Sequence, residues 1–403
     1  MDSLPDGIVI KQYNEDMHPL LEDLETSTAI PLGKQFPLNQ IKACNSLQQN
    51  YNAKSKQFKE FIILVAVEEL TQKVIGVVNA VVKKVLFSGK SEVKVAQMFG
   101  LKVHKAYRRK GIASSLCLKL EEHLFKLDVS YLYVKADSTN YKAKGLYMSK
   151  LNYMEASTLR VKILNAEKSS EYVSKVSVDK GLRLTKEHYQ DKDMTLVNIW
   201  DVFKSSYYAG TYVAESGDSI AGVSLWDSSG LEDMNLVKVI LDLETLKKPF
   251  VHLLCLLGIL LLTLASLALT VVGFYLINSW FFSVCFLVLA VWVLIKVLKF
   301  GFVFVKYSHY AIYKKQARRG KLFGLFYKGE ESVRKQLVKQ LIQGVKYEAQ
   351  KLGLEYLIFE YGSKSPQAKY FPIHNFSMQV LQKALGKASV NEWSAESFID
   401  PRE

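Results

Sequence analysis

The chain of 403 residues has room for roughly two or three domains, and 49% hydrophobic residues are enough for sizeable cores. A formal net charge of +14 favours partners that carry phosphate or other anionic groups. The four cysteines form no CxxC pair, which argues against a zinc site and a disulfide framework, so no metal is expected. The N-terminal stretch lacks the basic start and apolar core of a secretory signal.

A strand, a basic loop with a glycine and a helix follow one another before residue 125. Residues 93–103, VKVAQMFGLKV, are rich in apolar and β-branched residues and predict a strand. After Gly111, apolar residues at helical spacing predict a helix. The amides of a helix N-terminus attract anions, and the loop YRRKG adds cationic side chains, so the segment is typical of a phosphate site. A solvated basic turn is the alternative interpretation.

A second strand follows at residues 129–137, VSYLYVKAD, and leads into STNYKAKGLYMSKLNY at residues 138–153. Two patterns now stand in order. One is L-x-V-x-x-x-x-R-x-x-G-x-A over Leu101–Ala113, and the other is N-x-x-A-x-x-L-Y over Asn140–Tyr147. Both resemble the acetyl-CoA motifs of the GNAT superfamily of N-acetyltransferases.

The resemblance implies an acyl-CoA N-acyltransferase fold with acetyl-CoA as co-substrate. It implies that the amides of Leu101 and Val103 pair with the pantetheine arm and that Asn140 contacts this arm. It makes Tyr147 the catalytic acid that protonates the departing thiolate, although a buried aromatic residue is the alternative interpretation. The residues that it assigns to the pyrophosphate are Arg108, Arg109, Lys110, Gly111, Ile112, Ala113 and Ser114.

The general base has no candidate on the strand that precedes the loop. Many relatives carry a glutamate on this strand, where the chain offers only Gln97. His104 lies just past the strand, and a surface loop histidine is the interpretation that we favour for it. A water relay or a loss of activity would also fit, so the base stays unassigned.

An apolar run in the middle of the chain, Phe250 to Ile295, contains no Asp, Glu, Lys or Arg. As one helix it would measure about 70 Å, roughly twice the thickness of the bilayer hydrocarbon. We therefore expect a transmembrane hairpin over residues 248–305, with helices at about 250–273 and 280–303. Lysine and arginine flank both sides, so both termini are expected in the cytosol. A buried hairpin in a soluble protein is the alternative.

The second half repeats patterns of the first. MFGLKV (98–103) is similar to LFGLFY (322–327), and YLYVKADS (131–138) to YLIFEYGS (356–363). Self-similarity at this spacing suggests two copies of one domain. We therefore expect an N-terminal GNAT domain over residues 1–157 and a degenerate GNAT-like domain over residues 158–403. The second copy has KGEESVRK in place of the basic loop, and its two glutamates would repel a pyrophosphate.

A narrower resemblance covers most of the chain outside the hairpin. DMTLVNIWDVFKSSYYAGTYVA (193–214), AGVSLW (221–226) and the C-terminal SFIDPRE are similar to the plant Hookless-type N-acetyltransferases. The resemblance implies an α/β fold of tandem GNAT-like halves with mixed central sheets and flanking helices. The expected hairpin departs from these plant proteins and puts a chromatin substrate in doubt.

Three functions are compatible with these features. The one we expect is a membrane-anchored N-acetyltransferase that acetylates a protein lysine, a protein N-terminus or a small amine. The second is an inactive GNAT-fold scaffold or subunit of a membrane complex. The third is a basic module for membranes or nucleic acid, but no RNA motif accompanies the charge, so nucleic acid is not an expected partner. The expected partners are acetyl-CoA, an unidentified amine and a lipid bilayer through residues 250–303, in the endoplasmic reticulum. The sequence identifies neither the acceptor nor the oligomeric state.

Overall fold

The computed structural model describes residues 4–28, 30–32, 41–45, 54–87, 91–190, 194–229, 231, 234–238, 318–386 and 400–402. The chain divides into two compact units. The first unit comprises residues 1–28, 45–233 and 317–403, and the second comprises residues 29–44 and 234–316. Strands β2 (Ile30–Leu32), β3 (Ile41–Asn45) and β13 (Met234–Lys238) form a separate small sheet in the order β13-β3-β2.

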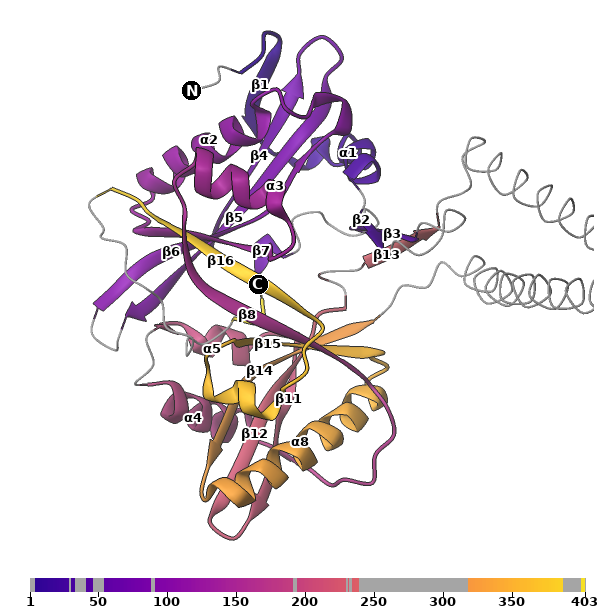
Figure 1. The fold of residues 1–403 in the computed structure, drawn as a ribbon, viewed down its shortest axis with the longest axis vertical. Coiled ribbons are helices and arrows are strands. Elements are labelled where there is room, and N and C mark those ends of the chain that lie inside the picture. The colour runs from indigo at the N-terminus through magenta and orange to yellow at the C-terminus, as the bar shows by residue number, and fades with distance from the viewer. Residues whose placement is uncertain are drawn as a thin grey trace, which may run out of the picture. The chain divides into compact units, whose positions relative to one another are not determined.

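The described part of the first unit is built on one sheet of thirteen strands (Figure 1). Its strands, in spatial order, are β1 (Ile8–Gln12), β4 (Glu60–Glu68), β5 (Lys73–Phe87), β6 (Ser91–Val103), β7 (Tyr131–Asp137), β16 (Phe376–Ala384), β8 (Met154–Asn165), β15 (Tyr356–Gly362), β14 (Arg319–Lys328), β12 (Ser219–Asp227), β11 (Tyr208–Ser216) and β9 (Ser174–Val176). A further strand, β10 (Met194–Leu196), pairs with β5.

Helices cover this sheet on both sides of its centre (Figure 1). Helix α2 packs on β4, β5 and β6, and helix α8 packs on β11, β12, β14 and β15. The helices are α1 (Leu21–Thr28), α2 (Ile112–Lys126), α3 (Tyr141–Lys144), α4 (Val178–Tyr189), α5 (Ile199–Phe203) and α8 (Glu331–Lys351). The short helical turns are η1 (Glu15–Met17), η2 (Ser55–Gln57), η3 (Lys105–Tyr107), the π-helical η4 (Gly145–Lys150) and η5 (Pro366–Tyr370).

The last strand of the chain lies in the middle of the sheet. Strand β16 pairs antiparallel with β7 on one side and with β8 on the other, and β8 in turn pairs antiparallel with β15. Beyond these neighbours come two parallel pairs, β6 with β7 and β14 with β15. On each side of the β16–β8 pair the next pairing is therefore antiparallel and the one after it parallel.

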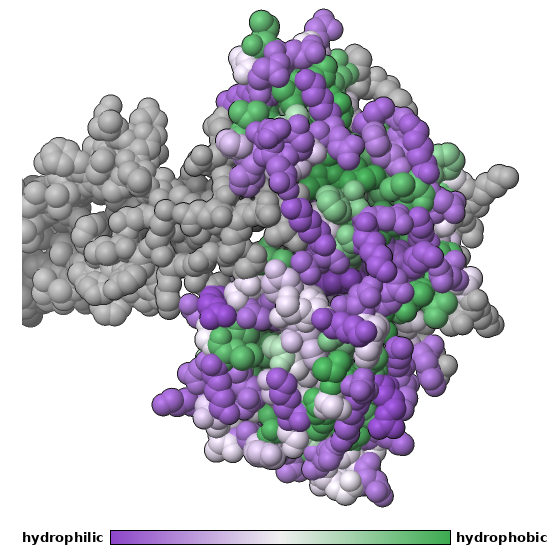
Figure 2. All heavy atoms as spheres, turned by 180° about the vertical axis from the view of Figure 1, so that it is seen from behind, coloured by the Kyte–Doolittle hydropathy of each residue, from purple (hydrophilic) through white to green (hydrophobic). Residues whose placement is uncertain are grey.

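The helix predicted after Gly111 is confirmed as α2, and its apolar stripe supplies a core. Ile112, Leu116, Leu120 and Leu124 are each at most 1% exposed and recur every four residues, so they share the face that packs on the sheet. The strands predicted at 93–103 and 129–137 are confirmed as β6 and β7. The face seen in Figure 2 is mostly hydrophilic, with hydrophobic residues in several separate groups.

The expectation of a transmembrane hairpin over residues 248–305 is corrected. That segment lies outside the described residues, and among the described residues no helix combines the length and the apolar character needed to cross a membrane. The 21-residue helix α8 is long enough, but Lys335 and Lys339 on its exposed side make it an amphipathic helix of the sheet layer. The bilayer partner through residues 250–303 and the multi-pass location in the endoplasmic reticulum have no support and are withdrawn.

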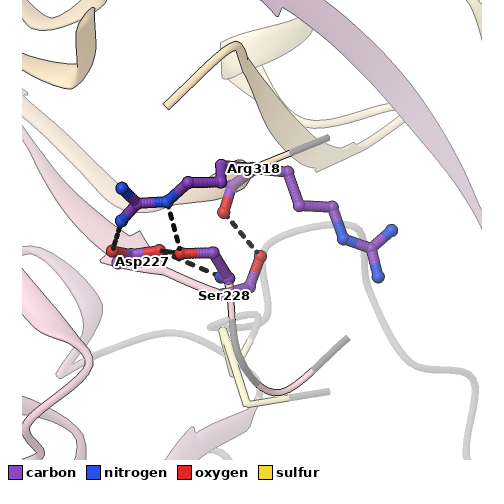
Figure 3. Close-up of polar contacts among 5 residues, drawn as sticks. Asp227, Ser228 and Arg318 are labelled. Carbon is purple, nitrogen blue, oxygen red and sulfur yellow. Dashed lines mark hydrogen bonds and ion pairs between the residues drawn. The ribbon is translucent and has the colours of Figure 1, made fainter. Parts of the chain in front are cut away.

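Strands β12 and β14 are adjacent and antiparallel, although residues 228–318 separate them in sequence. Asp227 lies opposite Gly320 in their register. Figure 3 shows polar contacts that join the two strand ends: Arg318 Nη2 lies 3.3 Å from Asp227 Oδ2, and Ser228 Oγ donates to the Arg319 carbonyl at 3.0 Å. The segment between them is therefore an insertion at the position of a hairpin turn.

Candidate active site

Strands β6 and β7 separate part-way along their length. They pair in parallel from Val95–Tyr131 to Met98–Val134, and beyond Met98 only β5 pairs with β6. Gly100 lies two residues beyond Met98, with φ of +65°, and the β5–β6 register shifts at this point. A Cβ at Gly100 would lie 2.6 Å from the Asn79 side chain, so the left-handed bulge requires glycine. The bulge turns β6 away from β7.

The unpaired edge of β6 carries the peptide groups of Leu101 and Val103. The His104 N–H donates to the Ile75 carbonyl of β5 at 2.8 Å, so the His104 peptide faces β5. Peptide groups alternate along a strand, so those of Leu101 and Val103 face the opposite edge, which β7 leaves unpaired. Arg108 Nε donates to the Val103 carbonyl at 3.0 Å on this edge. An extended amide chain such as pantetheine can pair there as an added strand.

The basic loop has the geometry of an anion cradle. Arg109 and Gly111 both have left-handed backbone, with φ of +63° and +79°. Left-handed backbone is strained for arginine, by about 1–2 kcal/mol, and such strain is concentrated at functional sites. Left-handed residues in a turn help to direct successive N–H groups to one concave side, where an anion can bind. Arg108, Arg109 and Lys110 are exposed, so their charges surround this concavity.

The N-terminus of α2 continues this cradle. Gly111 is its N-cap, and it supplies no side-chain hydrogen bond to the first amides of the helix. Uncapped amides at a helix start are the donors that bind phosphate. Ser114 Oγ donates to the Gly111 carbonyl at 2.7 Å, and Ile112 is 1% exposed in the core. Ile112, Ala113 and Ser114 therefore offer backbone amides to a ligand, with Ser114 also fixing the turn.

Asn140 is the N-cap of α3, and its Oδ1 accepts the Ala143 N–H at 3.1 Å. Asn140 is exposed, so its predicted contact with the cofactor arm would use the side-chain NH2 group. The second motif thus positions the helix that leads to Tyr147.

Tyr147 lies in the π-helical turn η4, a type of turn that is frequent at functional sites. It is 4% exposed, and its ring centroid lies 5.4 Å from that of Tyr153. Burial, with a smaller contribution from Cys117, raises the pKa of its hydroxyl. A hydroxyl that keeps its proton at neutral pH can act as an acid but not as a base. The burial also agrees with the alternative interpretation of Tyr147 as a core residue.

A buried polar group beside Tyr147 could not be found from the sequence. Glu121 of α2 is 8% exposed, and its Oε1 accepts the Tyr153 hydroxyl at 3.0 Å. Its Oε2 accepts Lys383 Nζ at 2.7 Å, from strand β16 near the end of the chain. Burial and Glu121 raise the pKa of Tyr153. No local pattern connects positions that are 262 residues apart.

The corresponding edge in the second half is occupied by side chains. The parallel pairing of β14 with β15 ends at Leu322–Phe359, and Gly324 has φ of +62°. The Leu325 carbonyl, which stands where Leu101 stands in the repeated sequence, accepts the Tyr189 hydroxyl at 3.2 Å and Gln367 Nε2 at 3.1 Å. This occupied edge gives a physical reason to expect no cofactor there.

The comparisons with known proteins agree with this geometry. Residues 34–153 match the family model described as the acetyltransferase (GNAT) family. The matched residues include both motifs of the candidate site, Leu101–Ala113 and Asn140–Tyr147. The chain is 33% identical over 107 residues to the acetyl transferase GW6a of Oryza sativa subsp. japonica, a match that covers 25% of this chain and 26% of the relative. The match thus spans about a quarter of the length of the Oryza protein.

Two solved structures share the fold. The N-myristoyltransferase of Saccharomyces cerevisiae with bound myristoyl-CoA is similar with a TM-score of 0.53 and 11% identity, over 94% of this chain and 83% of that one. A GCN5-related glucosamine N-acetyltransferase region of a fungal multi-domain GH3 beta-N-acetylglucosaminidase has a TM-score of 0.53 and 10% identity, over 94% of this chain and 38% of that one. At these identities the likeness concerns the fold alone.

A second family model, described as regulatory signalling modulator protein AmpE, matches residues 240–352. Of these, residues 318–352 are described, and they include β14 and α8 of the large sheet layer.

The match of residues 34–153 to the GNAT family supports the predicted class of acetyl-CoA-dependent N-acetyltransferase and acetyl-CoA as its co-substrate. Within the described ranges, no three His, Cys, Asp or Glu side chains gather as metal ligands. The roles of the individual site residues and the boundaries of the two halves stay predictions.

Proposed function

We propose that the protein is an N-acetyltransferase that transfers the acetyl group of acetyl-CoA to an amine, either a protein lysine, a protein N-terminus or a small amine. The observation that carries the proposal is the conjunction of two features in the GNAT domain. Among the described strands none pairs with the edge of β6 at Leu101 and Val103, where the Val103 carbonyl accepts Arg108 Nε. The loop that follows leads directly into the uncapped N-terminus of α2. One ligand with an extended amide arm and a pyrophosphate matches both features.

Each residue of the site then has one role toward acetyl-CoA. Leu101 and Val103 bind the pantetheine amides, and the loop from Arg108 to Ser114 binds the pyrophosphate through backbone N–H groups and cationic side chains. Bound acetyl-CoA supplies the thioester that the amine attacks. Tyr147, which burial keeps protonated, donates its proton to the departing sulfur.

The same proposal includes two GNAT-like halves, residues 1–157 and 158–403. It is supported by the matching strand directions on either side of the β16–β8 pair and by the two glycine bulges that follow the two parallel pairs. On this interpretation each half contributes its last strand to the sheet of the other. The second half is structural, because Tyr189 and Gln367 fill the edge at Leu325. The narrower kinship with Hookless-type plant proteins stays a prediction.

A second candidate function is an inactive scaffold with the same fold. One observation favours it: the strand β6 has the amide Gln97, 3% exposed, where a carboxylate would serve as base. The two candidates differ in turnover. A scaffold binds acetyl-CoA but transfers nothing to any amine.

Calorimetric titration of acetyl-CoA tests the proposal, with wild type compared with Arg108→Glu/Gly111→Glu. The matched control is Lys328→Glu/Gly217→Glu, which makes the same kinds of change at an exposed lysine and a left-handed turn glycine of the second half. We expect the first variant to bind more than about tenfold more weakly because it places two carboxylates beside the pyrophosphate, and the control to bind as wild type does. Absence of binding by the wild type would refute the cofactor site. Release of CoA with a lysine peptide, a peptide with a free N-terminus and spermidine then separates enzyme from scaffold.

A further inference from the structure

A buried glutamate lies beside the proposed cofactor edge and has no assigned role. Glu25, on α1, is 1% exposed. Its Oε2 is 2.5 Å from Lys102 Nζ, and its Oε1 has no hydrogen-bond partner among the described residues. A buried carboxylate oxygen without a partner is costly, so it calls for an explanation beyond packing.

Lys102 fixes the position of this carboxylate along β6. It lies past Met98, where the pairing with β7 has ended, and between Leu101 and Val103. Those two residues present the peptide groups that pair with the pantetheine arm in the proposed function. The ion pair therefore holds Glu25 at the same level of the strand as the cofactor arm.

The two faces of the sheet differ at the level of Leu101 and Val103, and this bears on the side from which an acceptor amine reaches the cofactor. Leu101 and Val103 pack against the core that α2 covers, so the face toward α2 is filled at this level. Lys102 points to the other face, where α1 packs through Leu21 and Leu24 on the odd-numbered residues of β4, Ile63, Val65 and Val67. The same face carries Gln97, because its neighbours Ala96 and Met98 pack toward α2. At this level of β6 the face opposite α2 holds Lys102 and Glu25, and the proposal takes this face as the side from which the amine approaches the thioester.

We propose that Glu25 is the general base of the acetyl transfer, supplied by α1 in place of the carboxylate that β6 lacks. This assignment rests on the proposed function. Glu25 Oε2 stays on Lys102, and Oε1 is the oxygen that accepts a proton from the acceptor.

The step balances in protons and electrons. The acceptor ammonium gives one N–H proton to Glu25 Oε1, and the nitrogen lone pair forms the C–N bond with the acetyl carbon. The C–S bond breaks with its electron pair on sulfur, which takes the proton of Tyr147. A second N–H proton of the amine restores Tyr147, and Glu25 releases its proton to water. The sum is ammonium plus acetyl-CoA giving the acetamide, the CoA thiol and one proton.

The test is steady-state kinetics of the full chain with Glu25→Gln, using the amine of the three-member panel above that the wild type acetylates fastest. We expect kcat to fall about 100-fold or more, the usual effect of losing a general base, while acetyl-CoA binding by calorimetry stays within threefold of wild type. The matched control is Glu15→Gln, which removes the exposed ion pair with Lys56 at 2.8 Å and should leave kcat unchanged.

Lys102→Gln separates a base from a structural ion pair, because it breaks the same pair but keeps the carboxylate. If Glu25 is the base, Lys102→Gln lowers kcat by less than tenfold and Glu25→Gln by far more. Equal losses in the two variants, or a Glu25→Gln enzyme that keeps more than a tenth of the wild-type kcat, would overturn the assignment of Glu25. A Glu25→Gln protein that no longer binds acetyl-CoA would also overturn it, since the residue would then serve the fold. Wild type that binds acetyl-CoA but acetylates no amine would refute the enzyme itself and the base with it.

Discussion

Replacement of Lys383 by methionine tests how the last strand is held in the sheet. Lys383 Nζ contacts Glu121 Oε2 at 2.7 Å, and the side chains are 23% and 10% exposed. Breaking one partner of a fully buried ion pair costs about 3–5 kcal/mol, because the other charge stays buried without compensation. The partial exposure of Lys383 lets water reach the site, so we expect about 2 kcal/mol for Lys383→Met. The methionine keeps most of the apolar contact of the lysine stem.

The matched control is an exposed ion pair on α2, the helix that carries Glu121. Lys126 contacts Glu122 at 2.9 Å, but these side chains are 65% and 47% exposed. An exposed pair of this kind is worth at most about 0.5 kcal/mol, so Lys126→Met should hardly change stability. Urea unfolding followed by tryptophan fluorescence measures both variants against wild type. The reasoning is refuted if the two substitutions lower the free energy of unfolding by the same amount.

Four more predictions concern the site and the fold. Gly100→Ala should lower the free energy of unfolding by about 1–3 kcal/mol and weaken acetyl-CoA binding, because it strains the left-handed bulge. The control for the calorimetric titration is Gly7→Ala, since Gly7 is also left-handed but a Cβ added there would meet nothing within 4 Å. Tyr147→Phe should lower kcat about 100-fold and leave binding intact, and equal kcat would remove its acid role. Burial raises the pKa of Tyr147 and of Tyr153, so above pH 10 the unfolded chain loses these protons first and thermal stability should fall as the pH rises. Deletion of residues 230–317 with an Asn-Gly turn between β12 and β14 should leave the first unit folded by circular dichroism, and loss of cooperative unfolding would contradict the insertion.

The sequence determined the local elements of the site. The strand at 93–103, the helix after Gly111 and the strand at 129–137 form because their apolar residues follow the periods of strand and helix. The direction of the Leu101 and Val103 peptides depends in addition on the pairing of β6 with β5, in which the His104 N–H donates to the Ile75 carbonyl. The glycine of MFGLKV forms the bulge, because only glycine fits its left-handed backbone beside Asn79. The strands and the helix depend on residues that are near one another in the chain, whereas the bulge and the peptide directions also depend on the neighbouring strand β5.

The apolar run was interpreted by the same local rules, and that interpretation did not hold. Hydrophobic length predicts a span, but the described fold supplies no membrane-crossing helix, and its 21-residue helix α8 packs on the sheet. Tyr147 shows a second limit. Its motif predicts a role near the thioester, whereas its burial depends on the packing of η4 against α2 and Tyr153.

The tertiary structure alone decided which distant residues meet. It placed β16 between β7 and β8, Lys383 on Glu121, Lys102 on Glu25, and Tyr189 and Gln367 on the Leu325 carbonyl. These pairs are 262, 77, 136 and 42 residues apart, and each partner is an ordinary residue of its own strand or helix. A sequence period reports which face of an element is buried, but not which other element covers it. The motifs of the cofactor loop could therefore be found by inspection of the sequence, whereas the candidate base and the occupied edge of the second half depend on how the sheet is assembled.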